Sequence, residues 1–203
     1  MHNSMLRFGV CMVALLVLAV GCAKAPQETV TAVRAVLDSV QVAEVEKYAP
    51  EQYKAAKDSL DAALTEIEKQ NSKFALTRKY GKAEAQLEAS QALARAAAEQ
   101  AVANKAKMKA EAEDMMAQMQ AAIAEAKTLI EQAPRGKGEA AALESIKNDV
   151  AALEMTATEV SNAMAKEDFI GAREMARAGL EKIQGINTEL KTAIEKKTMK
   201  KAG

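Results

Sequence analysis

Four methionines gather in the middle of the chain, and their sulfur atoms are the side-chain groups best suited to hold a metal ion. They are Met108, Met115, Met116 and Met119. Thioether sulfur is a soft ligand that suits Cu(I), and Met115 and Met119 share one helix face because they lie four residues apart. Methionine beside alanine also fills irregular apolar interiors. We predict that the four residues pack in a core and that the protein uses no metal or other cofactor. A Cu(I) site is the alternative.

Acid–base and nucleophilic chemistry has few candidates. Three carboxylates fall within residues 111–114, but on a charged helix such clusters are ordinarily solvated surface. The only histidine is His2, and the only cysteines are Cys11 and Cys22. No Gly-rich phosphate loop accompanies them. Because a Ser–His or Cys–His pair needs a histidine in the mature protein, we predict no catalytic residues and no enzyme activity.

The first 21 residues have the pattern of a targeting segment. Arg7 precedes an apolar run of thirteen residues, which as a helix covers about 20 Å and is too short to span the ~30 Å hydrocarbon core of a bilayer. The run ends in Leu18-Ala-Val-Gly21-Cys22, which resembles the lipobox of bacterial lipoproteins. The resemblance implies cleavage between Gly21 and Cys22 and acylation of Cys22. An ordinary secretory signal cut near Ala23 is the alternative.

Cleavage changes what the mature chain contains. Removal of residues 1–21 takes away His2 and Cys11, so the one remaining cysteine carries lipid and no internal disulfide forms. Several acyl chains anchor a protein far more durably than one. An aspartate directly after the acylated cysteine resembles an inner-membrane retention signal. This chain has Ala23 at that position, so the resemblance implies that the protein is at the periplasmic face of the outer membrane. Residues 22–27 form a short lipidated tether.

The composition favours helices. The chain has 203 residues, of which alanine supplies 45, with 9 Gly and 3 Pro. Equal numbers of basic and acidic residues, 28 each, and only 3% aromatic residues exclude a nucleic-acid binder. With 49% hydrophobic residues the chain is not disordered. We predict an all-α protein.

Hydrophobic periodicity predicts five helices. The boundaries between these helices are marked by Pro50, Asn71-Ser72, the loop that begins at Pro134, and Asp168. The predicted helices span residues 26–48, 50–70, 73–133, 139–166 and 168–197. Their predicted core positions include Val30, Val33, Leu37, Val40, Tyr53, Ala56, Leu60, Leu76, Tyr80, Ala83, Leu87, Ser90, Ala94, Ala97, Ala101, Leu143, Ile146, Val150, Leu153, Val160, Phe169, Ala172, Leu180, Ile183, Ile186 and Leu190.

The helix lengths predict an elongated arrangement of antiparallel bundles. The first two helices match the first half of the helix at 73–133, and the last two match its second half, so two three-helix bundles share one long central helix. Self-association of that helix as a coiled coil is the alternative. The predicted organisation is a signal peptide at 1–21, the tether at 22–27, bundle regions at 28–103 and 104–197, and a basic tail at 198–203.

A wider resemblance covers about residues 30–103. The helix junction Tyr48-Ala49-Pro50, the segment Tyr80-Gly-Lys-Ala83 and the alanine-rich run at 89–98 make this region similar to an uncharacterised family of alanine-rich helical lipoproteins, catalogued as a domain of unknown function. The resemblance implies an envelope location and a helical fold, and it carries no catalytic residues over to this chain.

These patterns lead to a functional expectation. We expect a membrane-anchored periplasmic lipoprotein that acts as a structural, spacer or adaptor protein, with an envelope protein or a second copy of itself as partner. The basic tail adds a weak contact with the cell wall. A ligand-binding or metal-chaperone protein that uses the methionine face or an inter-helix cavity is the alternative.

Overall fold

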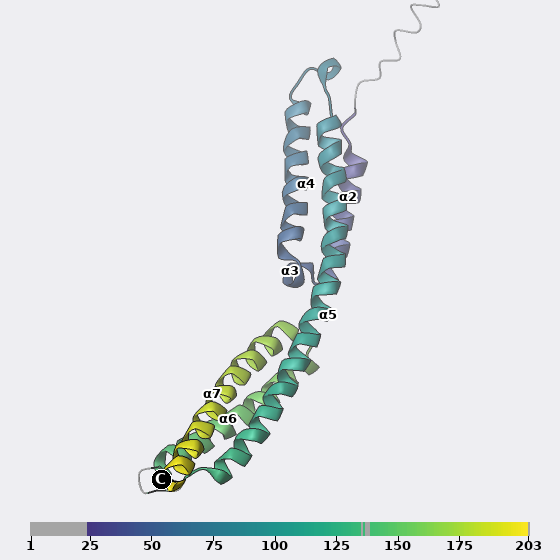
Figure 1. The fold of residues 1–203 in the computed structure, drawn as a ribbon. Coiled ribbons are helices and arrows are strands. Elements are labelled where there is room, and N and C mark those ends of the chain that lie inside the picture. The colour runs from purple at the N-terminus through teal and green to yellow at the C-terminus, as the bar shows by residue number, and fades with distance from the viewer. Residues whose placement is uncertain (1–23, 135, 137–138, 203) are drawn as a thin grey trace, which may run out of the picture. The chain divides into compact units, whose positions relative to one another are not determined.

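The computed structural model describes residues 24–134, 136 and 139–202, and within these residues it contains helices and no strands. The chain therefore has the predicted all-α fold. Six α-helices and one short 3₁₀ turn follow one another, labelled as in Figure 1. They are α2 (Gln27–Gln41), α3 (Val45–Tyr48), α4 (Pro50–Asn71), η2 (Ala75–Thr77), α5 (Gly81–Gln132), α6 (Ala140–Ala165) and α7 (Phe169–Ala202).

The chain divides into two compact units, the first ending at Val102 and the second beginning at Ala103. Unit 1 consists of α2, α3, α4 and the first part of α5, and unit 2 consists of the rest of α5 with α6 and α7. The 52-residue helix α5 is the predicted long central helix. Since helix α5 crosses the boundary without a break, the two units share one continuous backbone element.

The core of unit 1 follows the predicted helical period. The apolar stripe of α2 is buried, as is that of α4, and both face α5. The matching positions on α5 are fully buried and mostly small: Ala83, Leu87, Ser90, Ala94, Ala97 and Ala101. This stripe is therefore covered within the single chain, without a second copy. Ser90 sits close enough to α4 to donate a hydrogen bond of 2.7 Å from Oγ to the carbonyl oxygen of Ala56.

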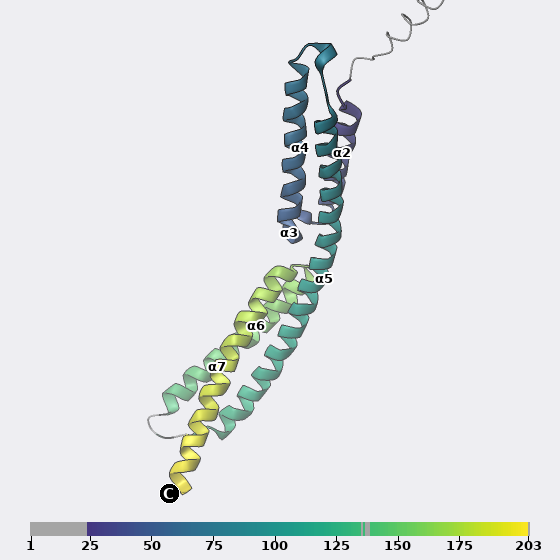
Figure 2. The same cartoon turned by 45° about the horizontal axis from the view of Figure 1, so that its top comes forward.

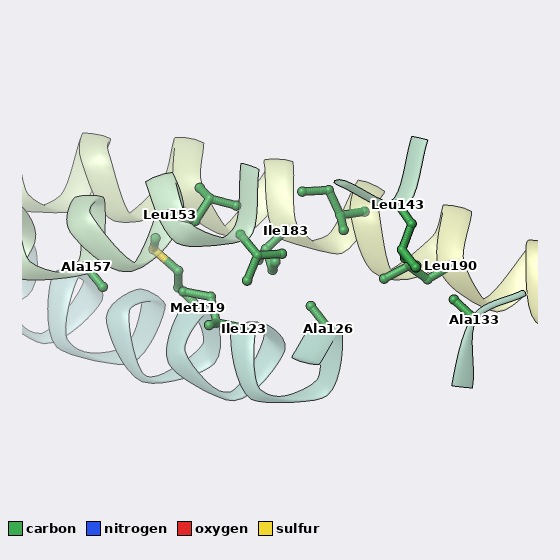
Figure 3. Packing of buried hydrophobic residues seen from close by; sticks show 11 residues of the cluster. Met119, Ile123, Ala126, Ala133, Leu143, Leu153, Ala157, Ile183 and Leu190 are labelled. Atoms are coloured by element: carbon green, nitrogen blue, oxygen red, sulfur yellow. The ribbon is translucent and has the colours of Figure 1, made fainter. Parts of the chain in front are cut away.

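Unit 2 has a more aliphatic core (Figure 3). The larger of its two clusters contains Met119, Ile123, Ala126, Ala133, Leu143, Val150, Leu153, Ala157, Ile183, Ile186 and Leu190, contributed by α5, α6, α7 and the start of the α5–α6 connection. A smaller cluster contains Ala112, Val160, Ala172 and Ala176. The predicted core positions of all three helices in this unit are buried or half-buried.

The predicted first helix at 26–48 is wrong, because the chain turns after α2. Glu44 has a φ of 53°, in the left-handed region that non-glycine residues rarely adopt, and Val45 begins a separate helix. Val45 does not fall on the stripe that Val30 to Val40 form, and the turn allows it to reach the core, where it is fully buried.

The long helix begins later than predicted, at Gly81 rather than residue 73. Asn71 and Ser72 end α4 instead of capping the next helix: the Ser72 N–H donates to Glu68, and its hydroxyl donates to Lys69. Residues 72–80 form a loop, here called the tip loop. Leu76, predicted to be in the core, is exposed in this loop.

The remaining boundaries are close to prediction. Asp168 caps α7, where its Oδ1 accepts a hydrogen bond of 3.4 Å from the Gly171 N–H. Gly171 leaves room for this carboxylate, since a Cβ there would lie 2.3 Å from Oδ2. Helix α7 continues to Ala202, so the segment predicted as a basic tail at 198–203 is helical up to that residue. Gly203 lies outside the described residues.

Candidate functional site

The predicted lipidation site at Cys22 and the cleavage position at Gly21 lie outside the described residues. The structure describes the chain from Lys24 onward, with Gln27 as the first helical residue. Val30, on the next turn, is already buried. Five residues, 22–26, therefore connect the predicted lipid attachment point to a packed helix, a distance of at most about 17 Å.

The four candidate metal ligands have separate packing roles. Met119 is fully buried and packs against Gly179. A Cβ added at Gly179 would lie 2.6 Å from Met119 Cε, so the glycine leaves room for the methionine. Met115 and Met116 pack against the smaller cluster of unit 2. Met108 Sδ accepts a hydrogen bond of 2.8 Å from Arg173 Nη1. These contacts fit the predicted role of the methionines as packing residues.

The carboxylates at 111–114 are engaged with neighbouring side chains. Glu111 Oε2 lies 3.1 Å from Arg173 Nη1, and Glu113 lies 4.0 Å from Lys109. Asp114 accepts a hydrogen bond from Gln118. Among the described residues, no three His, Cys, Asp or Glu side chains are grouped so as to hold a metal ion.

Arg173 is the centre of a charged cluster in unit 2. Its guanidinium contacts Glu111 on α5 and lies 2.7 Å from Glu174 beside it on α7. Hydrogen bonds to Glu174 and Glu111 raise the pKa of Arg173 above its usual value. The hydrogen bond from Arg173, aided by the charge of Arg177, lowers the pKa of Glu174. The cluster ties α5 to α7 beside the smaller apolar cluster.

Replacing Glu174 with Gln should destabilise the protein at neutral pH and much less in acid. Because the folded-state pKa of Glu174 is lowered, its contribution to stability is complete above the ordinary value of 4.5 and is lost as the pH falls through the folded-state pKa. Unfolding free energies of the Glu174→Gln and unsubstituted proteins, measured at neutral pH and at about pH 3, test this. Glu181→Gln, an exposed glutamate of the same helix, is the control, and an equal effect of both substitutions would contradict the prediction.

The tip loop is held by polar contacts at the end of α4. Arg78 donates from Nη2 to the Asn71 carbonyl at 2.9 Å and from Nε to the Lys73 carbonyl at 3.0 Å. The Tyr80 hydroxyl donates to Asn71 Oδ1 at 2.5 Å. Buried Gln70 accepts a hydrogen bond from the backbone N–H of Lys79.

Gln70 also sets the charge state of its neighbour Glu66. Gln70 Nε2 donates to Glu66 Oε1 at 2.6 Å, and this hydrogen bond, together with the charges of Lys69 and Lys82, lowers the pKa of Glu66. Glu66 is therefore a carboxylate at neutral pH although its side chain is largely covered. Through its hydrogen bond with Gln70, Glu66 helps to hold the base of the tip loop.

An open groove lies at the end of unit 2, between α7 and the described residues of the α5–α6 connection. Its volume is about 1250 Å³, and its wall includes Gly185, Thr188 and Ala193. The charged residues at its rim, among them Glu189 and Lys196, are exposed. None of the described residues that line the groove is a buried charged group that would select a ligand.

Comparison with known proteins adds no relative. No family model, no curated protein and no solved structure matches this chain. The resemblance to alanine-rich helical lipoproteins therefore stays a prediction. None of the described helices has an apolar stretch long enough to cross a bilayer.

Two structural residues escaped the sequence analysis. Asn187 is buried on the core side of α7, where its Nδ2 donates to the Ala122 carbonyl at 2.9 Å and to Glu125 at 3.0 Å. Its position four residues after Ile183 is the signal that places it on the stripe. Phe74 is 73% exposed in the tip loop. The sequence analysis missed this exposure because it predicted a continuous helix from residue 73.

Proposed function

We propose that this protein is a lipid-anchored lipoprotein at the periplasmic face of the outer membrane, where it acts without catalysis as a structural, spacer or adaptor protein of the cell envelope. The short path from Cys22 to the first packed helix carries the proposal. A bundle that begins five residues after an acylated cysteine is held beside the bilayer.

The surfaces of both units support a binding or spacing role. The apolar stripes of α5, α6 and α7 are used within the chain. Exposed charges are paired within one helix, as in Lys54–Asp58, or between two helices, as in Lys182–Asp149. Single large apolar side chains remain outside, including Val42 in unit 1 and Met155 in unit 2. These exposed apolar positions are where we test for a docked partner.

Crosslinking in living cells tests the proposal. A photoreactive residue at Val42 or Met155 is irradiated in the lipidated protein, and the adducts are purified from the membrane fraction and identified. We expect either one reproducible envelope protein, which would make this protein an adaptor, or adducts only with a second copy, which would make it a spacer.

The crosslinking needs a matched position that no partner should contact. Lys54, an exposed residue on α4 that is paired with Asp58, serves this purpose, and the same photoreactive residue there should give no adduct. Recovery of the protein in the soluble fraction, with no adduct from any position, would contradict the proposal.

A further inference from the structure

The tip loop presents two large apolar side chains to solvent. Phe74 is 73% exposed and Leu76 is 68% exposed, on either side of Ala75 in the 3₁₀ turn η2. The other large apolar side chains that the structure describes in unit 1 are buried or half-buried, apart from Val42 near the end of α2 and Val102 at the unit boundary. An adjacent pair of this kind is a candidate contact with an apolar phase.

The exposure of this pair does not come from a loosely held loop. The side chain of Arg78 holds the carbonyls of Asn71 and Lys73, and Gln70 Oε1 accepts hydrogen bonds from the Lys79 backbone at 3.1 Å and from Lys73 Nζ at 3.0 Å. These contacts hold the loop backbone against the end of α4, while the side chains of Phe74 and Leu76 lie exposed.

Basic residues surround the pair. Between residues 69 and 83 the chain has five cations and no acidic residue, although the whole sequence is balanced. The five are Lys69, Lys73, Arg78, Lys79 and Lys82. Exposed apolar side chains that lysine and arginine flank in the sequence match the boundary of an anionic bilayer, where acyl chains lie beneath phosphate groups.

The tip loop lies at the end of unit 1 where the chain would leave the membrane. Helix α2 begins at this end, and in both Figure 1 and Figure 2 the loop stands beyond the first turn of α2. Helix α4 is seven residues longer than α2, about 10 Å at 1.5 Å per residue. A tether at 22–26 that spans up to about 17 Å allows the loop to reach the surface in which Cys22 is anchored.

We propose that the tip loop is a second membrane contact, in which Phe74 and Leu76 enter the interface of the bilayer and the surrounding basic residues bind the phosphates of anionic phospholipids. This inference rests on the lipid anchor proposed above. It assigns an orientation to unit 1, with the tip loop against the membrane and the end that carries Val42 away from it.

A depth measurement on the full-length, lipidated protein tests this contact. The acylated Cys22 is the only cysteine of the mature chain, so Thr77→Cys or Val42→Cys introduces a single free thiol for an environment-sensitive fluorophore. The protein is reconstituted in vesicles of phosphatidylethanolamine and phosphatidylglycerol that contain a spin-labelled lipid. We expect strong quenching of the label at 77 and little quenching at 42.

Substitution of the apolar pair tests the side chains themselves. In the Thr77→Cys protein, Phe74→Ser with Leu76→Ser should reduce the quenching to the level seen at position 42. The matched control, Val42→Ser with Met155→Ser, removes two exposed apolar side chains elsewhere and should leave it unchanged. Circular dichroism checks that each protein keeps its helices.

The basic residues have their own test. Lys69→Gln with Lys79→Gln should reduce the quenching at 77 several-fold and remove its dependence on phosphatidylglycerol. The control, Lys54→Gln with Lys57→Gln, removes two exposed cations from the side of α4.

Failure of the contact and failure of the anchor give different results. If the protein floats with the vesicles while positions 77 and 42 are quenched equally, the tip-loop contact is wrong and the anchor stands. If the protein does not float and Cys22 reacts with a thiol reagent, the anchor is wrong and the contact is overturned with it. If position 77 is protected from labelling in cells but is unquenched in vesicles, the loop binds a protein, which overturns the lipid assignment.

Discussion

Replacing Cys22 with Ala should abolish acylation of this protein and remove it from the membrane fraction as a mature species. If the chain is cleaved after Gly21 as we propose, Cys22 is the only cysteine left, so no other thiol could take the lipid. Each buried CH₂ contributes about 0.8 kcal/mol to membrane binding, so loss of the acyl chains removes most of the affinity. Incorporation of an alkynyl fatty acid, followed by detergent phase separation, measures both effects.

The chain offers a matched control in its other cysteine. Cys11 lies within the predicted signal segment, so a Cys11→Ala protein should be acylated and membrane-bound like the unsubstituted one. Persistent labelling of Cys22→Ala would contradict the lipid anchor. Equal loss of labelling in both variants would point to failed export instead.

Truncation of Ile183 should cause a large loss of stability. Ile183 is fully buried in the main cluster of unit 2, where it packs with Met119 and Leu153 (Figure 3). Ile183→Ala leaves a cavity that the surrounding helices fill only in part, and we expect a loss of about 2–5 kcal/mol in the free energy of unfolding. Urea denaturation of residues 24–203, followed by far-UV circular dichroism, measures it.

Two further substitutions calibrate this loss. Ile183→Val removes one methyl group and should cost about 0.5–1.5 kcal/mol. Gln184→Ala changes the exposed neighbouring residue on α7 and should change the stability by less than about 0.5 kcal/mol. If Ile183→Ala were no more damaging than Gln184→Ala, the packing described for unit 2 would be wrong.

The sequence predicted the helices well wherever one apolar stripe continued without interruption. The stripes through Leu87, Val150 and Ile183 are buried as expected, since a period of 3.6 residues depends only on local sequence. The two errors fall where tertiary contacts override that period. Val45 reaches the core through a left-handed residue at 44, and the cap at the end of α4 needs the side chain of Arg78 from seven residues further on.

The candidate sites were less accessible to sequence reasoning. The methionine cluster was visible from residue type, but its packing role depends on Gly179, a residue about 60 positions away that makes room for Met119. The exposure of Leu76 could not be found from the period, because Leu76 continues the apolar stripe of Tyr80 and Ala83, whereas Phe74 lies off that stripe. Contacts of Gln70, Arg78 and Tyr80, which a helical period does not report, hold the tip loop at the end of α4.

Because some methionines of unit 2 are buried and others are exposed, their oxidation can report the opening of this unit. Met155 and Met199 are 64% and 73% exposed, whereas Met119 is fully buried against Gly179. Under an oxidant the exposed thioethers become sulfoxides first, and Met119 oxidises only in molecules whose unit 2 has opened. The ratio of sulfoxide at Met119 to that at Met155, read by mass spectrometry, therefore reports how often the helices of unit 2 separate inside the cell.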